Sequence, residues 1–214
     1  MIGRALLAGL LVAGVASAQG LDVSLGGYRA SQNAGALGSV SGRAYVERRR
    51  VAGPDQPLVG ASIVLVPRSP AFLARLAEIK MRARDDLQAY RGSAPAVRRA
   101  REEYERALWE AGAADLVHTA VAGADGRFRL EGLPAGDWVL VATHAELVNR
   151  HVPSAGKKEQ RTYTRPPRLS GYQAVTVWLR ELTITGGRAE GLELTDRNGW
   201  FSGVVEETTL DAGG

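Results

Sequence analysis

The sequence predicts a mainly β protein: a β-sandwich of about seven or eight short strands with an inserted α-helical hairpin. Apolar and polar residues alternate through most of the chain, which is the period of a strand with one buried face. Turn signals such as Asp125-Gly126 and Asn198-Gly199 separate these runs. Between residues 69 and 112 the apolar spacing changes to three and four, which is typical of amphipathic helices. Many short strands between turns favour a sandwich, with the helices as an insertion.

Two strands are expected before the helices. Residues 39–47 alternate, with Val40, Ala44 and Val46 on one face and polar residues on the other. A charged loop follows and ends at Pro57. Residues 58–66 are then apolar on both faces, which predicts a central strand that is covered on both sides.

The helical hairpin is expected over residues 69–112. Ser69 can cap a first helix that begins at Pro70. An Arg-Gly-Ser triplet at 91–93 interrupts the pattern, so a second helix is expected to begin at Ser93 and to end at Gly112. On its polar side, arginines and glutamates stand four residues apart, a spacing that allows ion pairs.

Residues 119–144 are expected to form a β-meander. Alternating runs lie on either side of two breaks, the Asp125-Gly126 turn and the Leu-Pro-Ala-Gly stretch at 133–136. Such an arrangement predicts consecutive strands joined by tight turns.

The last part of the chain begins with a basic, poorly patterned segment. Residues 146–171 are expected to form a long loop, and loops of this length are usually functional or disordered. A strand over 175–184 follows. A hairpin over 191–206, turning at its Asn-Gly pair, is expected to complete the fold.

The first 18 residues have the pattern of a secretory signal peptide. Arg4 precedes an apolar run, and Ala-Ser-Ala at 16–18 matches a small-residue cleavage site. The run is about half of the roughly 20 residues that a membrane span needs, which favours cleavage over a retained anchor. We therefore expect an exported protein, periplasmic or secreted, with no transmembrane span after cleavage. Residues 19–38 are expected to be a flexible leader or a short edge strand, and residues 39–210 the sandwich.

Composition excludes several classes of chemistry. The chain has 214 residues, enough for one domain, and no cysteine, which excludes a disulfide framework, a thiol nucleophile and a cysteine zinc site. Without the signal peptide, 26 basic residues face 23 acidic ones. A net charge of +3 does not indicate a nucleic-acid ligand.

Four segments carry a resemblance to a known family. They are GRAYV at 42–46, PLVGASIVL at 57–65, DGRFRL at 125–130 and LPAGDWVLVA at 133–142. Together they resemble the carboxypeptidase regulatory-like domain family, with Trp138 in place of the usual tyrosine. The resemblance implies a transthyretin-like (prealbumin-like) sandwich and a non-catalytic accessory module of an exported protein, without a cofactor. The helical insertion and the lack of an accompanying peptidase domain depart from the family's pattern.

Enzymatic alternatives find weaker support. The Tyr-Arg-Gly-Ser tetrapeptide at 90–93 resembles the C-terminal signature of hydroxyisourate hydrolases, which share this fold, but it lies mid-chain. Ser154 and Lys157 fit an S-x-x-K pattern without its partner motifs. His118, His144 and His151 lack the spacing of a metal site. A hydrolase is therefore the third hypothesis.

The first hypothesis is an exported, non-catalytic module with a structural or protein-interaction role at the cell envelope, where its partner would be an envelope protein or polysaccharide. The second is a carbohydrate-binding module, which would stack sugars on exposed aromatic side chains; the candidates are Trp178, Trp200, Tyr163 and Tyr172. The basic segment is a further candidate, for binding an anionic surface. Its cations are Arg150, Lys157, Lys158, Arg161, Arg165 and Arg168.

Overall fold

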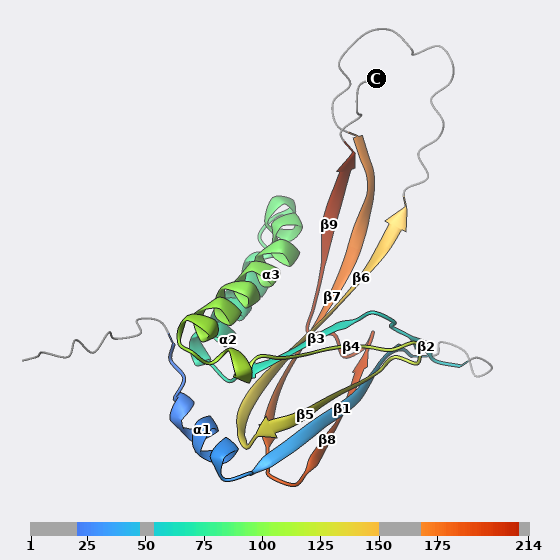
Figure 1. Ribbon diagram of the computed structural model, residues 1–214. Coiled ribbons are helices and arrows are strands. Elements are labelled where there is room, and N and C mark those ends of the chain that lie inside the picture. The colour runs from blue at the N-terminus through green and yellow to red at the C-terminus, as the bar shows by residue number, and fades with distance from the viewer. Residues whose placement is uncertain (1–20, 48–53, 150–167, 210–214) are drawn as a thin grey trace, which may run out of the picture.

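The computed structural model describes residues 21–47, 54–149 and 168–209, which form two β-sheets and three α-helices (Figure 1). The first sheet, sheet A, has four strands: β1 (Leu37–Val46), β2 (Gln56–Pro57), β5 (Arg127–Pro134) and β8 (Ala189–Thr195). The second, sheet B, has five in the order β4 (His118–Val121), β3 (Ser62–Pro67), β6 (Gly136–Asn149), β7 (Arg168–Ile184) and β9 (Phe201–Thr209). The expected β-rich architecture with a helical pair is confirmed, with nine strands described rather than seven or eight.

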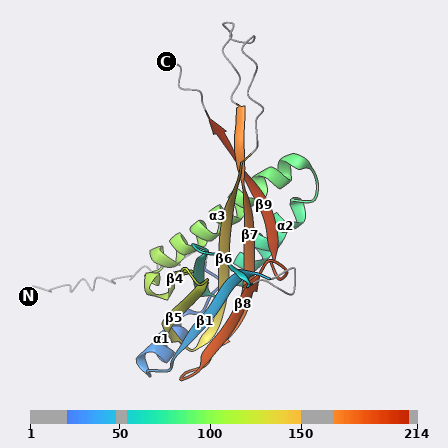
Figure 2. The same ribbon diagram turned by 90° about the vertical axis from the view of Figure 1, so that its right-hand side faces the viewer.

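The helices are α1 (Leu25–Asn33), α2 (Pro70–Arg82) and α3 (Leu87–Glu110), with a short 3₁₀ turn, η1 (Ala114–Leu116). The α2–α3 pair lies on one side of sheet B and sheet A lies on the other (Figures 1 and 2). No helix among the described residues is long and apolar enough to cross a membrane.

The core forms on both faces of sheet B. In β3, Ile63 and Leu65 alternate with Val64 and Val66, and all four are buried. Residues 138–142 of β6 are buried in the same way. The expectation of a strand covered on both sides is therefore confirmed, because sheet A covers one face and the helical pair the other.

The helical hairpin begins as expected and turns earlier than expected. The Ser69 hydroxyl accepts a hydrogen bond from the backbone N–H of Phe72, and Pro70 is the first helical residue. The predicted break at residues 91–93 is wrong, since they lie inside α3. That helix is capped by Asp86, whose carboxylate accepts from the N–H of Ala89 at 2.8 Å. The apolar face of α3 is buried against the rest of the protein. The free energy gained by this burial outweighs the local cost of Gly92 and Pro95 inside the helix.

The N-terminal segment differs from the expected flexible leader or edge strand, because residues 25–33 form a helix. Tyr28 is buried, and its ring meets Trp138 edge-on with the centroids 5.1 Å apart. The Tyr28 hydroxyl donates to the carbonyl of Asp137, and Arg29 pairs with Asp115. These contacts hold α1 against the lower end of the sandwich in Figure 1.

The predicted meander is wrong in its pairing. Gly126 has a φ of 76°, so the expected turn is present. However, β4 pairs with β3 in sheet B, β5 pairs with β1 in sheet A, and β6 returns to sheet B. The turns before β5 and after it therefore carry the chain between sheets, where the sequence suggested hairpins.

The same correction applies to the predicted C-terminal hairpin. The Asn198 side chain closes the expected turn, accepting from the N–H of Thr195 and donating to the carbonyl of Glu193, both at 2.9 Å. The strands on either side do not pair with each other. Instead, β8 runs parallel to β1 and β9 pairs with β7.

The ends of the predicted basic loop are strands. Residues 146–149 of β6 pair with residues 171–174 of β7, and Arg168 faces Thr209 of β9. As a result β6, β7 and β9 extend beyond the sandwich as a three-stranded projection, seen at the top of Figures 1 and 2.

Candidate functional site

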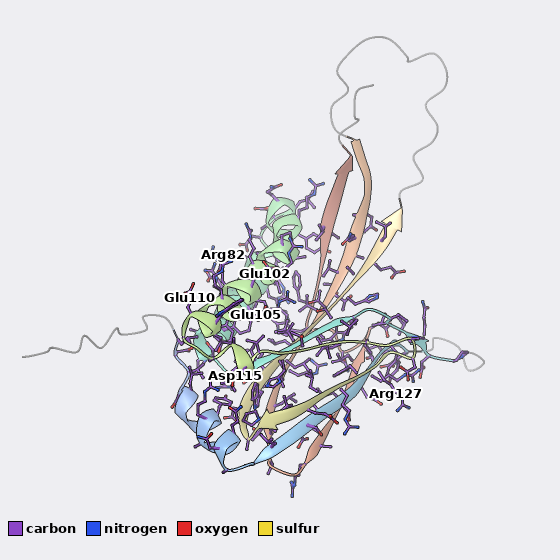
Figure 3. All side chains as sticks on the ribbon, viewed as in Figure 1. Arg82, Glu102, Glu105, Glu110, Asp115 and Arg127 are labelled. Carbon is purple, nitrogen blue, oxygen red and sulfur yellow. The ribbon has the colours of Figure 1, made fainter. Side chains whose placement is uncertain are left out.

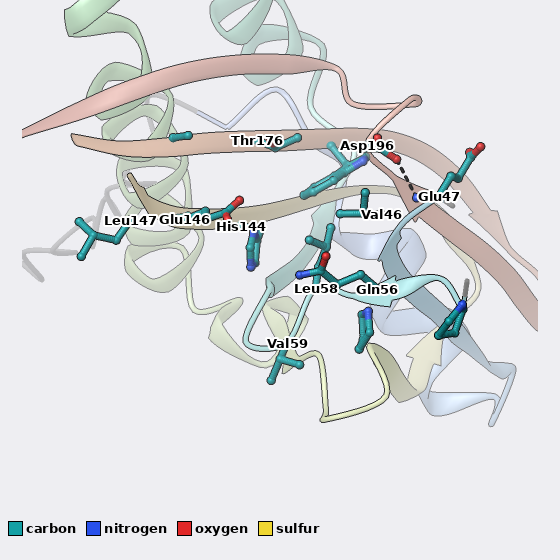
Figure 4. Close-up of a pocket in the computed structure, with 15 residues that line it drawn as sticks. Val46, Glu47, Gln56, Leu58, Val59, His144, Glu146, Leu147, Thr176 and Asp196 are labelled. Atoms are coloured by element: carbon teal, nitrogen blue, oxygen red, sulfur yellow. Dashed lines mark hydrogen bonds between the residues drawn. The ribbon is translucent and has the colours of Figure 1, made fainter. Parts of the chain in front are cut away.

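A cleft of about 1030 Å³ lies where β6 and β7 of sheet B begin to project beyond sheet A (Figure 4). One wall comes from the end of β1, from β2 and from the turn that follows it. The other comes from β6 and β7. The lining residues are Val46, Glu47, Pro54, Gln56, Pro57, Leu58, Val59, His144, Ala145, Glu146, Leu147, Ala174, Thr176, Trp178 and Asp196.

Strand alternation places the polar groups of the second wall. On β6, His144 and Glu146 share the face that Ala142 presents to the core, and the pairing of His144 with Thr176 aligns β7 beside them. The strand leaves the core at this point, because β3 pairs with β6 only as far as Thr143. Side chains that would be buried inside the sandwich are therefore accessible here.

Three carboxylates give the cleft an acidic character. Asp196 accepts a hydrogen bond from the backbone N–H of Glu47 at 2.9 Å, which holds the β8–β9 turn against the end of β1. Arg197 lies 2.8 Å from a carboxylate oxygen of Glu47 and neutralises it in part. Glu146, on the opposite wall, is exposed. Among the lining residues, the basic counterpart of these carboxylates is His144.

Apolar side chains border the acidic groups. Val59 and Leu147 are 54% and 52% exposed, which is high for aliphatic residues beside a cleft. Leu58 and Trp178 form the buried floor, and the Trp178 indole N–H donates to the carbonyl of Thr195 at 2.8 Å. The cleft thus combines negative charge with exposed aliphatic surface, a combination that suits a peptide segment better than a small polar molecule.

The predicted aromatic row is not formed in the described part of the chain. Trp178 is fully buried, so its selection as a stacking residue is wrong. Trp200 is half-buried, and the Lys80 ammonium lies 4.7 Å from its ring centroid, over one face. Tyr172 is half-buried on β7, and Tyr163 lies outside the described residues. Trp178 lies on the side of β7 that faces the core, so packing explains its burial.

The predicted anionic-surface site stays a prediction. Arg168 begins β7, and the remaining candidates lie outside the described residues: Arg150, Lys157, Lys158, Arg161 and Arg165.

Two residues from the weaker enzymatic alternatives, His118 and Ser93, play different roles in the fold. His118 is half-buried, and its ring lies 5.5 Å from that of Trp138. Burial lowers the pKa of His118, and the charge of Asp115 offsets this only in part. Ser93 lies inside α3, where its hydroxyl donates to the carbonyl of Tyr90. Within the described residues, no three histidine or acidic side chains are grouped so as to hold a metal ion.

Sequence reasoning missed the carboxylates of the cleft. Glu47, Glu146 and Asp196 come from three distant segments, and only the parallel pairing of β8 with β1 brings two of them together. His144 and Glu146 stand two residues apart, which was the available signal for a shared strand face. The sequence instead suggested a loop from residue 146, whereas β6 continues to Asn149.

Outside the cleft, many charged side chains lie on the helical pair. Paired arginines and glutamates, including Arg82, Glu102 and Glu105, cover the helical pair, whereas Arg127 lies at the opposite side of the molecule (Figure 3). Arg101 and Glu105, four residues apart on α3, lie 3.0 Å apart, as the sequence predicts. Arg82 and Glu78 form the same kind of pair on α2, at 2.6 Å.

Comparison with known proteins gives structural similarity without a family. No family model matches the chain, and no curated protein matches it. Among solved structures, a candidate carbohydrate-binding protein of Pseudomonas aeruginosa is 17% identical with a TM-score of 0.44, over 81% of this chain and 97% of that one. The minor pilin GBS52 of Streptococcus agalactiae is 12% identical with a TM-score of 0.31, over 84% of this chain and 48% of that one.

A third similar structure is the pilus backbone protein of Streptococcus pneumoniae. It is 19% identical with a TM-score of 0.22, over 49% of this chain and 30% of that one. The chain spans about half the length of the minor pilin. It is thus similar in structure to a candidate carbohydrate-binding protein and to pilin β-sandwich domains.

Proposed function

We propose that the protein is an exported, non-catalytic module of the cell envelope, with a prealbumin-like sandwich of the carboxypeptidase regulatory-like type, and that it binds a partner protein through the acidic cleft. The observation that carries the proposal is the cleft itself. It sets three carboxylates, Glu47, Glu146 and Asp196, around aliphatic side chains that remain exposed. A peptide segment with lysine or arginine between apolar residues complements that surface.

The form of the cleft also supports a protein ligand over a sugar. Sugar-binding sites on sandwiches use open aromatic faces, and Trp178 contributes none because its ring is buried. The exposed edge of β6 adds a second element. From His144 to Asn149 this strand pairs with β7 on one side, and no described strand pairs with the other. An extended peptide beside that edge gains backbone hydrogen bonds in addition to side-chain contacts.

Photo-crosslinking in the native host tests the proposal. A photoreactive residue is placed at Gln56 on one wall or at Leu147 on the other, both exposed cleft positions. The control position is Arg188, exposed in the turn between β7 and β8 at the far end of sheet A. We expect the same protein adduct from both cleft positions and none from the control.

A glycan array with the purified protein completes the test. A sharp glycan signal, together with the absence of a cleft-specific protein adduct, would overturn the proposal in favour of carbohydrate binding. Equal adducts from Arg188 and from the cleft positions would show that the cleft is not the interaction site.

A further inference from the structure

A second cavity, of about 360 Å³, lies on the other face of the same strands, between α3 and sheet B. It is independent of the acidic cleft, apart from a rim shared at Val59, His144 and Ala145. The other lining residues are Gly60, Ser62, Ala94, Pro95, Val97, Arg98, Arg101, Val141, Thr143, Gln173, Val175, Val177 and Val205.

The cavity exists because α3 leans on one edge of the sheet. A Cβ added to Gly203 of β9 would lie 3.0 Å from the Cβ of Ala94, so helix and strand approach closely there. Over β6 and β3 the gap widens, and Thr143 and Ser62 line its mouth. The close contact at β9 closes one side of the space and leaves the opposite side open.

The wall of the cavity is aliphatic. Val97, Val141, Val175 and Val177 are 1–7% exposed, and no phenylalanine, tyrosine or tryptophan is among the residues that line it. At Val141 and Thr143 the backbone of β6 pairs with β3 on one side and with β7 on the other. A narrow wall of valines with satisfied backbone groups offers nothing to a sugar or a planar ring. It matches a flexible hydrocarbon chain.

The charged side chains that line the cavity are cationic. They are Arg98 and Arg101, and no carboxylate lines the cavity among the described residues. Arg98 meets Glu102 only at 3.8 Å. The Nε of Arg101 lies 3.0 Å from a carboxylate oxygen of Glu105, so this guanidinium already has an ion-pair partner. An incoming carboxylate therefore finds one loosely paired guanidinium, that of Arg98, and a second, that of Arg101, which it would share with Glu105.

We propose that this cavity binds the single acyl chain of a free fatty acid, with the hydrocarbon against the valines and the carboxylate at Arg98 and Arg101. The volume lies near the lower end of the range of roughly 300–1,000 Å³ for ligand cavities. It fits one chain of medium length. The opposite charges of the two cavities separate their ligands, since the acidic cleft repels a carboxylate.

Titration calorimetry of the delipidated full-length protein tests the proposal, with octanoate, decanoate and dodecanoate as probes. Each added methylene that is buried should tighten binding about fourfold, which corresponds to about 0.8 kcal/mol. Dodecanol and dodecyltrimethylammonium carry the same chain without the carboxylate. We expect each to bind at least tenfold more weakly than dodecanoate.

Two kinds of variant locate the site. Arg98→Gln with Arg101→Gln should weaken dodecanoate binding at least tenfold and leave dodecanol binding unchanged. Arg99→Gln is the matched control, because Arg99 lies on the same helix and faces the groove between α2 and α3. Thr143→Trp should abolish binding by filling the mouth. If Thr143→Trp does not fold, the arginine variants decide.

Three results would each overturn the proposal. One is the absence of saturable binding at every chain length. Another is equal weakening by Arg99→Gln and by the arginine pair. The third is equal affinity for dodecanoate and dodecyltrimethylammonium.

Discussion

Replacing Trp178 with phenylalanine should lower the free energy of unfolding by about 2–3 kcal/mol. The indole is fully buried, and its N–H donates to the carbonyl of Thr195 at 2.8 Å. Phenylalanine leaves part of that space empty, at a cost of about 1–2 kcal/mol for one or two missing methylene equivalents. The lost hydrogen bond adds roughly 0.5–1.5 kcal/mol, because Thr195 keeps its second donor, the N–H of Asn198.

Urea unfolding followed by far-UV circular dichroism measures this change without relying on tryptophan fluorescence. With a slope of about 2 kcal/mol per molar urea, the midpoint should fall by about 1–1.5 M. Trp109→Phe is the matched control, since Trp109 is 74% exposed and the same substitution there should change stability by less than about 0.5 kcal/mol. If the two variants were equally stable, the indole of Trp178 would not be in the core, and the assignment of sheet B's inner face would be refuted.

Three further substitutions test other parts of the structure. Tyr104→Phe removes the hydrogen bond of 2.9 Å that the Tyr104 hydroxyl on α3 donates to the carbonyl of Pro67. The substitution should lower the free energy of unfolding by about 1–2 kcal/mol and speed amide exchange in α3. Unchanged exchange would show that this hydrogen bond does not anchor α3. His118→Gln should remove a pH dependence of the free energy of unfolding. Burial lowers the pKa of His118, so the wild type should be fully stabilised above about pH 6.5 and should lose stability as the pH falls toward the folded-state pKa. A variant whose stability changes with pH as steeply as that of the wild type would exclude this histidine as the source. Gly126→Ala should cost more than about 1 kcal/mol, because φ is 76° and the new Cβ would clash with the carbonyl oxygen of Ala44. Gly92 lies in open space on α3, so Gly92→Ala should be neutral or stabilising. Equal effects of the two substitutions in thermal melts would refute the turn geometry.

Local chemistry predicted local structure well in this chain. Ser69 before Pro70 marked the start of α2, and Gly126 marked a turn, because each effect operates within a few residues. The same rules failed at the start of α3. There the Arg-Gly-Ser triplet suggested a break, but the Asp86 cap and the packing of the helix on sheet B extended the helix through it.

Pairing between distant segments was the part that the sequence did not reveal. A turn signal such as Asn198-Gly199 indicates that the chain reverses, and it is equally compatible with a hairpin and with a passage between sheets. In this fold the chain passes between sheets, so β8 lies parallel to β1. The candidate cleft depends on that pairing, so the local sequence around Glu47, Glu146 and Asp196 does not indicate that they meet.

We propose that the acidic cleft binds a basic segment of a partner protein. The most direct measurement is the affinity of the cross-linked partner, once purified, for the wild type and for two charge-reversal variants. Glu146→Lys changes the exposed carboxylate of the cleft, and Glu190→Lys makes the same change near the start of β8, at the other end of sheet A. We predict at least a tenfold loss of affinity, about 1.4 kcal/mol, for Glu146→Lys and no loss for Glu190→Lys at about 0.15 M salt. Equal affinities of the two variants for the partner would contradict the claim.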